Sequence, residues 1–268
     1  MENKFDSWSK VILARDLKRP KAFTYINNLF EDFIELKGDR LFGEDEAIIG
    51  GIARFKGKNV TVIGIQKGTT ITENINRNFG MPKPEGYRKA LRLMKQAEKF
   101  KRPIILFVDT PGAFCGIESE ERGIGEAIAR NLMEMIKLST PIISIFIGEG
   151  GSGGALALGV ADEIWMLENS IYSILSPEGM ASILYKDASK ASEVSEKMKI
   201  TSQDLYKLDI IDRVIKEPEG GAQKDITKVV NALALNLEEA LGRFSMEPIE
   251  FLLSKRYSKF RRMGRYRD

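Results

Sequence analysis

Glycines crowd the point where an expected buried strand passes into an expected helix. The run reads Gly148-Glu149-Gly150-Gly151-Ser152-Gly153-Gly154. Backbone N–H groups at the start of a helix lack intrahelical partners and carry partial positive charge. Because glycine has no side chain, a negatively charged oxygen can approach those N–H groups closely. The run therefore indicates a site that stabilises an anion, although the same glycines would also allow a helix to pack tightly against a sheet.

A second glycine-bearing turn, residues 109–116, follows the adjacent apolar strand. Two such turns facing each other would form a two-sided pocket of backbone donors for an oxyanion. This second turn favours the anion-binding interpretation over simple packing.

The residue types that are absent narrow the chemistry further. The chain has no histidine and a single cysteine, Cys115. It therefore cannot build a Cys/His zinc site, and Ser-His-Asp or Cys-His catalysis is excluded. A carboxylate site for magnesium or calcium stays open in principle, but the acids show neither EF-hand spacing nor a tight cluster. We expect no metal on this chain.

The glycine run also fits two other motifs. Gly148, Gly150 and Gly153 match the dinucleotide fingerprint, and Glu168 follows at the distance expected for a ribose contact. The density of glycines exceeds what that motif needs. Ser152 stands in a Gly-x-Ser-x-Gly pattern. Without histidine, this pattern leaves a Ser-Lys hydrolase as the alternative, in which Ser152 would be the nucleophile rather than a small residue that caps the following helix.

A GTPase is a third alternative, and it fails. Residues 109–112 (Asp-Thr-Pro-Gly) resemble a switch motif and residues 3–6 (Asn-Lys-Phe-Asp) a base-recognition motif. No Gly-x-x-x-x-Gly-Lys-[Ser/Thr] loop exists to cradle the phosphates, so this interpretation is excluded.

The elements that must position these turns follow from hydrophobic spacing. Helical periodicity predicts a helix over residues 5–37, ended by Gly38. Two strands, residues 47–55 and 59–66, are expected to form a hairpin around Lys56-Gly57-Lys58. Residues 67–86 are expected to be a long loop, which in a compact domain is more often functional than accidental. Further helices are expected at 86–101, 121–138, near 152, 223–243 and 247–262, and further strands at 104–108, 142–147, 164–167, 171–175 and 210–215.

Short apolar strands between amphipathic helices are typical of an α/β layered domain. No internal repeat or linker divides the chain, so we expect residues 1–268 to form a single domain. This domain would have a helical N-terminal segment over about residues 1–40 and a basic helical tail over about 247–268.

Composition and charge place the chain in a broad class. Hydrophobic residues make up 43% and charged residues 29%, which is typical of a soluble globular protein. No apolar run could span a bilayer, no secretory signal is visible, and one cysteine allows no internal disulfide, so we expect a cytoplasmic protein without membrane contact. The net charge is +3. Seven of the cations lie in the tail: Lys255, Arg256, Lys259, Arg261, Arg262, Arg265 and Arg267. They could bind phosphates, but we favour a solvated terminal helix or a contact with a partner chain over nucleic-acid binding.

Five motifs stand in a recognisable order along the chain. They are residues 80–90 (GMPKPEGYRKA), 109–113 (DTPGA), 120–123 (EERG), 148–155 (GEGGSGGA) and 176–179 (SPEG). Together they closely resemble the alpha subunit family of bacterial acetyl-coenzyme A carboxylase carboxyltransferases, over about residues 22–262. One departure is Phe114-Cys115, where the family more often has Tyr-Pro.

The resemblance implies a ClpP/crotonase-like fold of repeated ββα units with flanking N- and C-terminal helices. It also implies an α2β2 assembly in which the beta subunit carries a cysteine-rich zinc finger. The enzyme would transfer a carboxyl group from carboxybiotin, carried by the biotin carboxyl carrier protein, to acetyl-coenzyme A. The product would be malonyl-coenzyme A, in the first committed step of fatty acid biosynthesis. ATP would be used only by the biotin carboxylase component.

The same resemblance gives the glycine turns a chemical role and explains the missing histidine. Carboxybiotin that has lost its carboxyl group can itself accept a proton from acetyl-coenzyme A, so that no side-chain base is needed. The alpha subunit would supply backbone donors for the biotin oxyanion. We expect Gly153 and Gly154 to provide this oxyanion hole and Gly112, Ala113, Gly150 and Gly151 to line the substrate site.

Within the family, a biotin-dependent acyl-coenzyme A or malonate decarboxylase subunit, or a carboxyltransferase for another acyl chain, are the alternatives. The resemblance alone indicates acetyl as the acyl group, because the coenzyme A contacts are expected on the partner.

Overall fold

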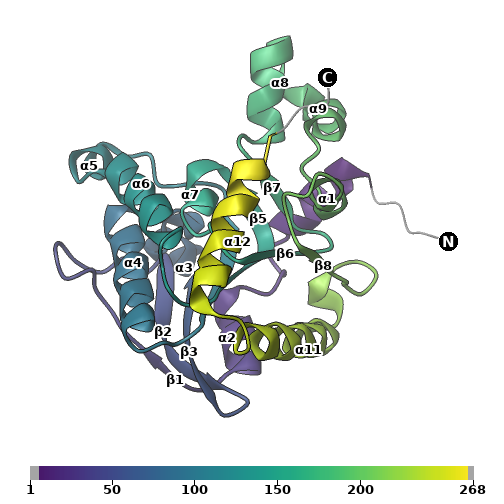
Figure 1. Ribbon diagram of the computed structural model, residues 1–268. Coiled ribbons are helices and arrows are strands. Elements are labelled where there is room, and N and C mark those ends of the chain that lie inside the picture. Colours follow the sequence, from purple (N-terminus) through teal and green to yellow (C-terminus); the bar gives the residue numbers. More distant parts are fainter. Residues whose placement is uncertain (1–5, 265–268) are drawn as a thin grey trace.

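The computed structural model describes residues 6–264, and Figure 1 shows their arrangement. The strands are β1 (Glu31–Glu35), β2 (Ile48–Phe55), β3 (Lys58–Ile65), β4 (Ile104–Thr110), β5 (Ile142–Gly151), β6 (Glu163–Leu167), β7 (Ile171–Ser173) and β8 (Arg213–Ile215). The helices of four or more residues are α1 (Ser7–Arg15), α2 (Ala22–Leu29), α3 (Ile71–Asn76), α4 (Pro84–Lys99), α5 (Ile117–Glu121), α6 (Ile124–Met135), α7 (Ser152–Leu156), α8 (Pro177–Tyr185), α9 (Ala191–Met198), α10 (Ser202–Lys207), α11 (Ile226–Phe244) and α12 (Ile249–Arg262).

One sheet organises the described chain. Its strands lie in the order β1-β2-β3-β4-β5-β6-β8, and β7 pairs with the far end of β5. The first three strands are antiparallel, and from β3 to β8 the neighbours are parallel. The predicted hairpin joins β2 to β3. Its loop residues Lys56 and Gly57 both have positive φ (46° and 79°), as a tight two-residue hairpin turn requires.

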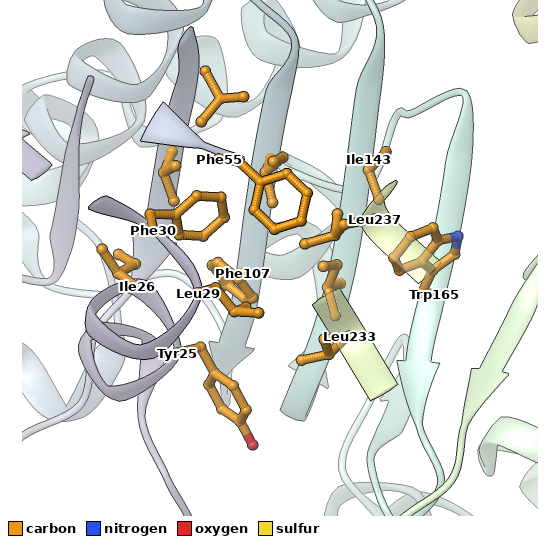
Figure 2. Close-up of a cluster of buried hydrophobic side chains, with 14 of the residues drawn as sticks. Tyr25, Ile26, Leu29, Phe30, Phe55, Phe107, Ile143, Trp165, Leu233 and Leu237 are labelled. Carbon is orange, nitrogen blue, oxygen red and sulfur yellow. The ribbon is translucent and has the colours of Figure 1, made fainter. Parts of the chain in front are cut away.

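The central strands are buried on both faces, which explains their continuous apolar sequences. On one face, Phe107 of β4 and Trp165 of β6 pack with residues of α2 and α11 in a large core cluster (Figure 2). On the other face, alternate residues such as Leu106 and Val108 pack against α4. Helix α4 begins with Pro84 and presents Tyr87, Ala90, Leu93, Met94 and Ala97 to the interior, the spacing expected of one helical face. The expectation of an α/β layered fold is confirmed.

The expected helix over residues 5–37 is wrong in its second half. Pro20 separates α1 from α2, because proline cannot donate a helical hydrogen bond and disfavours helix at the preceding residue. Residues 31–35 then form the edge strand β1, with Ile34 paired to Ile52 of β2. Pairing with a neighbouring strand therefore outweighs the helical spacing of Phe33 and Ile34, and the N-terminal segment is not purely helical. Residues 1–5 lie outside the described part.

The segment 67–86 is also more regular than expected. It contains α3, whose N-cap Thr70 accepts a hydrogen bond from the Glu73 N–H at 3.2 Å, and a short 3-10 turn at Asn78–Gly80. In contrast, α8 and α9 project from the body of the molecule (Figure 1). No helix within residues 6–264 combines the length and the apolar composition that a membrane span needs.

Candidate active site

The two glycine-bearing turns lie against each other at the carboxyl ends of β4 and β5. A Cβ atom on Gly151 would lie 2.1 Å from the carbonyl oxygen of Pro111. A Cβ atom on Gly154 would lie 2.5 Å from the amide nitrogen of Ala113. Because no real side chain tolerates such distances, the close approach of the two turns requires glycine at both positions. The expectation that the turns face each other is confirmed.

Strand β5 bulges as it approaches this edge. The ladder with β4 shifts its register between Val108 and Thr110, so that residues 147–149 lie opposite the single residue Asp109. The Asp109 carboxylate accepts a hydrogen bond from the Glu149 backbone N–H at 2.9 Å, where a ladder bond would otherwise be lost. Bulges of this kind re-aim the end of a strand and are common beside active sites.

Helix α7 begins directly after this bulge. Gly151 is its N-cap residue, and no side chain caps it. The first N–H groups of an α-helix have no intrahelical acceptor, and those of Gly153 and Gly154 belong to this set. The Gly154 carbonyl accepts a hydrogen bond from the buried Tyr87 hydroxyl at 3.2 Å, which ties α7 to α4. Backbone donors are therefore available where the sequence places them.

Ser152 does not cap this helix, contrary to expectation. It is the first helical residue, is exposed, and has a φ of 51°, in the left-handed region that costs energy for residues other than glycine. Among residues 6–264, no side chain forms a hydrogen bond with its hydroxyl. The lysine of this region, Lys67, is bound to Asp109 and Glu149 instead. The arrangement of a Ser-Lys hydrolase is therefore not formed.

The other residues expected to line the site share this edge but differ in environment. A Cβ atom on Gly112 would meet nothing within 4 Å, and its N–H donates to Thr110 Oγ1 at 3.0 Å. Ala113 is half-buried. Gly150 packs against aromatic rings, since a Cβ atom there would lie 2.5 Å from the Phe146 ring. Packing alone is therefore sufficient to require glycine at position 150.

A row of ion pairs joins the elements around the turns. Lys67 Nζ donates to Asp109 Oδ1 at 2.7 Å and to Glu149 Oε2 at 3.0 Å. Glu149 also accepts from Arg15 Nε at 2.7 Å, and Arg15 Nη1 donates to Glu178 at 2.6 Å. The sequence alone does not indicate this row, because its members come from five separate segments. The only local signal was that Lys67 and Asp109 lie at or just beyond the ends of apolar strands.

The electrostatics of this row keep its buried members charged. Burial disfavours the charged form of Asp109, but Lys67 and Lys21 hold the pKa of that carboxyl below its ordinary value. Burial likewise opposes the charge on Lys67, but Asp109 and Glu149 raise the pKa of its ammonium group above the ordinary value. The two groups therefore form a charged pair at neutral pH.

A small cavity adjoins the glycine turns. It has a volume of about 40 Å³ and is lined by Arg15, Ser173, Ser176 and the backbone of Gly150 and Gly151, among others. Pockets that enclose a small organic ligand usually measure about 300 Å³ or more. This cavity can therefore hold water or a group of a few atoms. A larger ligand would need further residues to enclose it.

The structure also bears on the metal and tail expectations. Within residues 6–264, no group of three or more Asp, Glu or Cys side chains is arranged to hold a metal ion.

In the tail, Arg256 is 1% exposed and donates to the carbonyls of Met135, Leu138 and Thr140 and to the Asp162 carboxylate. This cation therefore holds α12 on the body of the protein, and the expectation of a solvated helix is wrong for Arg256. Arg265 and Arg267 lie outside the described residues.

Solved structures with the same arrangement define the class of fold. Transcarboxylase 12S with methylmalonyl-coenzyme A and methylmalonic acid bound matches with a TM-score of 0.68 at 18% identity, over 88% of this chain and 44% of that chain. The Pseudomonas malonate decarboxylase hetero-dimer matches with a TM-score of 0.64 at 18% identity, over 81% of this chain and 90% of that chain. The fold is that of the crotonase-like carboxyltransferases. The strand order from β3 to β8 does not reverse, so the described chain lacks the switch point at which a doubly wound fold binds a dinucleotide, and that alternative is wrong.

Sequence relatives then specify the family. Residues 1–264 match the family described as acetyl co-enzyme A carboxylase carboxyltransferase-like. The acetyl-coenzyme A carboxylase carboxyl transferase subunit alpha of Clostridium acetobutylicum is 61% identical over 268 residues, which is 99% of this chain and 98% of that protein. The subunits beta/alpha protein of Clostridium tetani is 56% identical over 268 residues, which is 100% of this chain but only 47% of that protein. The chain belongs to the acetyl co-enzyme A carboxylase carboxyltransferase-like family.

Proposed function

We propose that this chain is the alpha subunit of an acetyl-coenzyme A carboxylase carboxyltransferase and provides the biotin half of its active site. The full-length similarity to proteins named as this subunit, at 61% identity, carries the proposal. The decarboxylase alternative rests on structures that are only 18% identical, which establishes a shared fold and no more.

Carboxybiotin would supply the transferable carboxyl group and, once that group has left, the atom that accepts the methyl proton of acetyl-coenzyme A. The contribution of this chain is electrostatic. The N–H groups of Gly153 and Gly154 would donate to the ureido oxygen as it gains negative charge, and fixed backbone donors need no reorganisation at that moment. The Ala113 amide lies beside Gly154 and would form the facing wall with Gly112.

The site also requires a second protein. The cavity of about 40 Å³ beside the turns is too small for a biotin ring system. We infer that a beta subunit, which would carry the zinc finger, closes the pocket and binds acetyl-coenzyme A in an α2β2 assembly. The biotin carboxyl carrier protein would deliver carboxybiotin in the cytoplasm, after the ATP-dependent biotin carboxylase has loaded it. The beta/alpha relative supports this division, because about half of that protein lies beyond the match to this chain.

The test compares the purified chain with the chain assembled with its beta subunit. The isolated chain should form no malonyl-coenzyme A from carboxybiotin and acetyl-coenzyme A, whereas the assembled protein should turn over. Turnover by a rigorously partner-free sample would refute the two-subunit site. A lack of turnover by the assembled protein with acetyl-coenzyme A, but activity with a longer acyl chain, would refute the substrate.

A further inference from the structure

We propose that Lys67, Asp109 and Glu149 are positioning residues that aim the backbone donors of α7. This inference rests on the proposed role of Gly153 and Gly154. It concerns side chains that do not touch the reacting atoms but set the direction of the strand end that carries the two glycines.

The bulge in β5 is the reason that the donors need support. Opposite Asp109, three residues of β5 stand against one of β4, so regular ladder bonds cannot fix this part of the strand. Side chains make the missing bonds. The Asp109 carboxylate accepts the Glu149 N–H at 2.9 Å, and Arg19 Nε donates to the Ile147 carbonyl at 2.6 Å. The bulge is therefore shaped by charged groups from other elements.

Lys67 connects the Glu149 carboxylate, in the bulge, to the Asp109 carboxylate that faces it. Its ammonium group donates to Asp109 at 2.7 Å and to Glu149 at 3.0 Å, and only 13% of its side chain is exposed. The segment around it is tightly packed: a Cβ atom on Gly80 would lie 2.5 Å from Lys67 Cγ, and one on Gly148 would lie 2.4 Å from Asp109 Oδ1. The backbone of Gly80 and Gly148 therefore packs directly against these two side chains.

Only a short stretch of chain connects Glu149 to the backbone donors of α7. Glu149 precedes the N-cap residue Gly151 by two positions and Gly153 by four, and the chain between them is the end of β5 and the first turn of α7. A shift of Glu149 therefore moves the whole turn. Misplacement of a reacting group by about 1 Å can cost roughly 10²-fold in rate, so a loss of this ion pair should appear in kcat.

The experiment uses the assembled carboxyltransferase with the variant Lys67→Met, which keeps the unbranched side chain but for its terminal ammonium group and so removes the charge. We expect kcat to fall about 10²-fold while the KM for acetyl-coenzyme A stays within about twofold, because the coenzyme A contacts lie on the partner. The matched control is Arg256→Met, which removes an even more deeply buried cation from Asp162 at the opposite end of the sheet. The control should keep kcat per assembled complex within about threefold. A Lys67→Met complex within threefold of wild type, or an equal loss in both variants, would overturn the proposal.

Two further variants keep the test decisive if Lys67→Met does not assemble. Glu149→Gln weakens the contacts of Glu149 with both Lys67 and Arg15. It should lower kcat about tenfold, which is typical when a group that orients a site residue is removed. Lys67→Arg retains the cation and should lose less activity than Glu149→Gln. The reverse order would contradict the proposal.

A double-variant cycle separates this inference from the proposed function. If Lys67 acts through the donors, adding Lys67→Met to Gly153→Val should lower kcat by less than about threefold more, because both changes remove the same interaction. If Lys67→Met instead lowered the kcat of Gly153→Val by the same factor as it lowers the kcat of the wild type, Lys67 would act elsewhere. If Gly153→Val alone left kcat unchanged, the donor assignment itself would fail, whatever the result for Lys67.

Discussion

The substitution Gly153→Val tests the oxyanion site most directly, because the structure has room for a Cβ atom at this position. A Cβ atom at Gly153 meets only the side chain of Ile128, at 3.8 Å, which is ordinary van der Waals contact. The φ angle of Gly153 is not positive, so an L-residue can keep the backbone in place. We therefore expect the variant to fold and to assemble with its partner.

Catalysis should nevertheless be lost. Along a helix, the Cα–Cβ bond tilts toward the N-terminus, so the branched side chain of Gly153→Val leans toward the space in front of the first N–H groups. A ligand oxygen held there would be pushed away from its donors. The loss of one oxyanion donor typically costs about 3–4 kcal/mol, or roughly 10²–10³ in kcat.

The assay measures the initial rate of malonyl-coenzyme A formation from carboxybiotin by the assembled protein, with assembly verified by size-exclusion chromatography. The control is Gly242→Val in α11, which lies outside the site and where a Cβ atom meets nothing within 4 Å. The control should keep wild-type turnover. An intact Gly153→Val complex with kcat within tenfold of wild type would refute the donor assignment.

Three other outcomes follow from the contacts. Gly154→Ala should lower the free energy of unfolding of the chain by about 1–3 kcal/mol, because its Cβ would lie 2.5 Å from the backbone of the facing turn; an unchanged midpoint in urea would contradict this. The double variant Ser152→Ala, Cys115→Ser should keep kcat within a few-fold of wild type, and a thousandfold loss in an intact complex would reinstate a side-chain nucleophile. Burial, opposed by hydrogen bonds from two backbone N–H groups, raises the pKa of Asp45 from 3.8 to about 6. Its contribution to stability is therefore fully present below pH 3.8 and falls by roughly 3 kcal/mol as pH rises through 6. Denaturation of wild type and Asp45→Asn from pH 4 to 7 should show this slope only in the wild type.

The sequence correctly predicts the elements whose patterns lie within a short stretch of the chain. The β2–β3 hairpin follows from Gly57, which tolerates the positive φ that its turn requires. The buried strands β4 and β5 follow from continuous apolar runs, and α4 from helical spacing. The strand β1 could not be predicted in this way, because Phe33 and Ile34 have helical spacing and only the pairing with β2 makes them extended.

The residues of the candidate site likewise divide into those that a local pattern predicts and those that it does not. The glycines could be found from composition alone, since their purpose is to remove side chains at one place in the chain. The ion pairs could not be found, because Arg15 and Glu149 are 134 positions apart and nothing near either residue indicates the other. Ser152 shows a subtler limit. Its position beside the glycines suggested a cap, but Gly151 is the N-cap of α7 and Ser152 is the first helical residue, with φ in the left-handed region.

The charged groups of this region act as structure rather than as acids or bases. The pKa of Asp109 lies below 3.8 and that of Lys67 above 10.5, so neither group changes its protonation between these values. Asp109 contributes its stability above pH 3.8 and loses it as pH falls further, whereas Lys67 contributes below pH 10.5 and loses it as pH rises further. Across the intervening range the pair holds the bulge in one shape, and the backbone donors that it supports do not titrate at all. Neither Lys67 nor Asp109 therefore contributes an inflection near neutrality to the pH dependence of turnover.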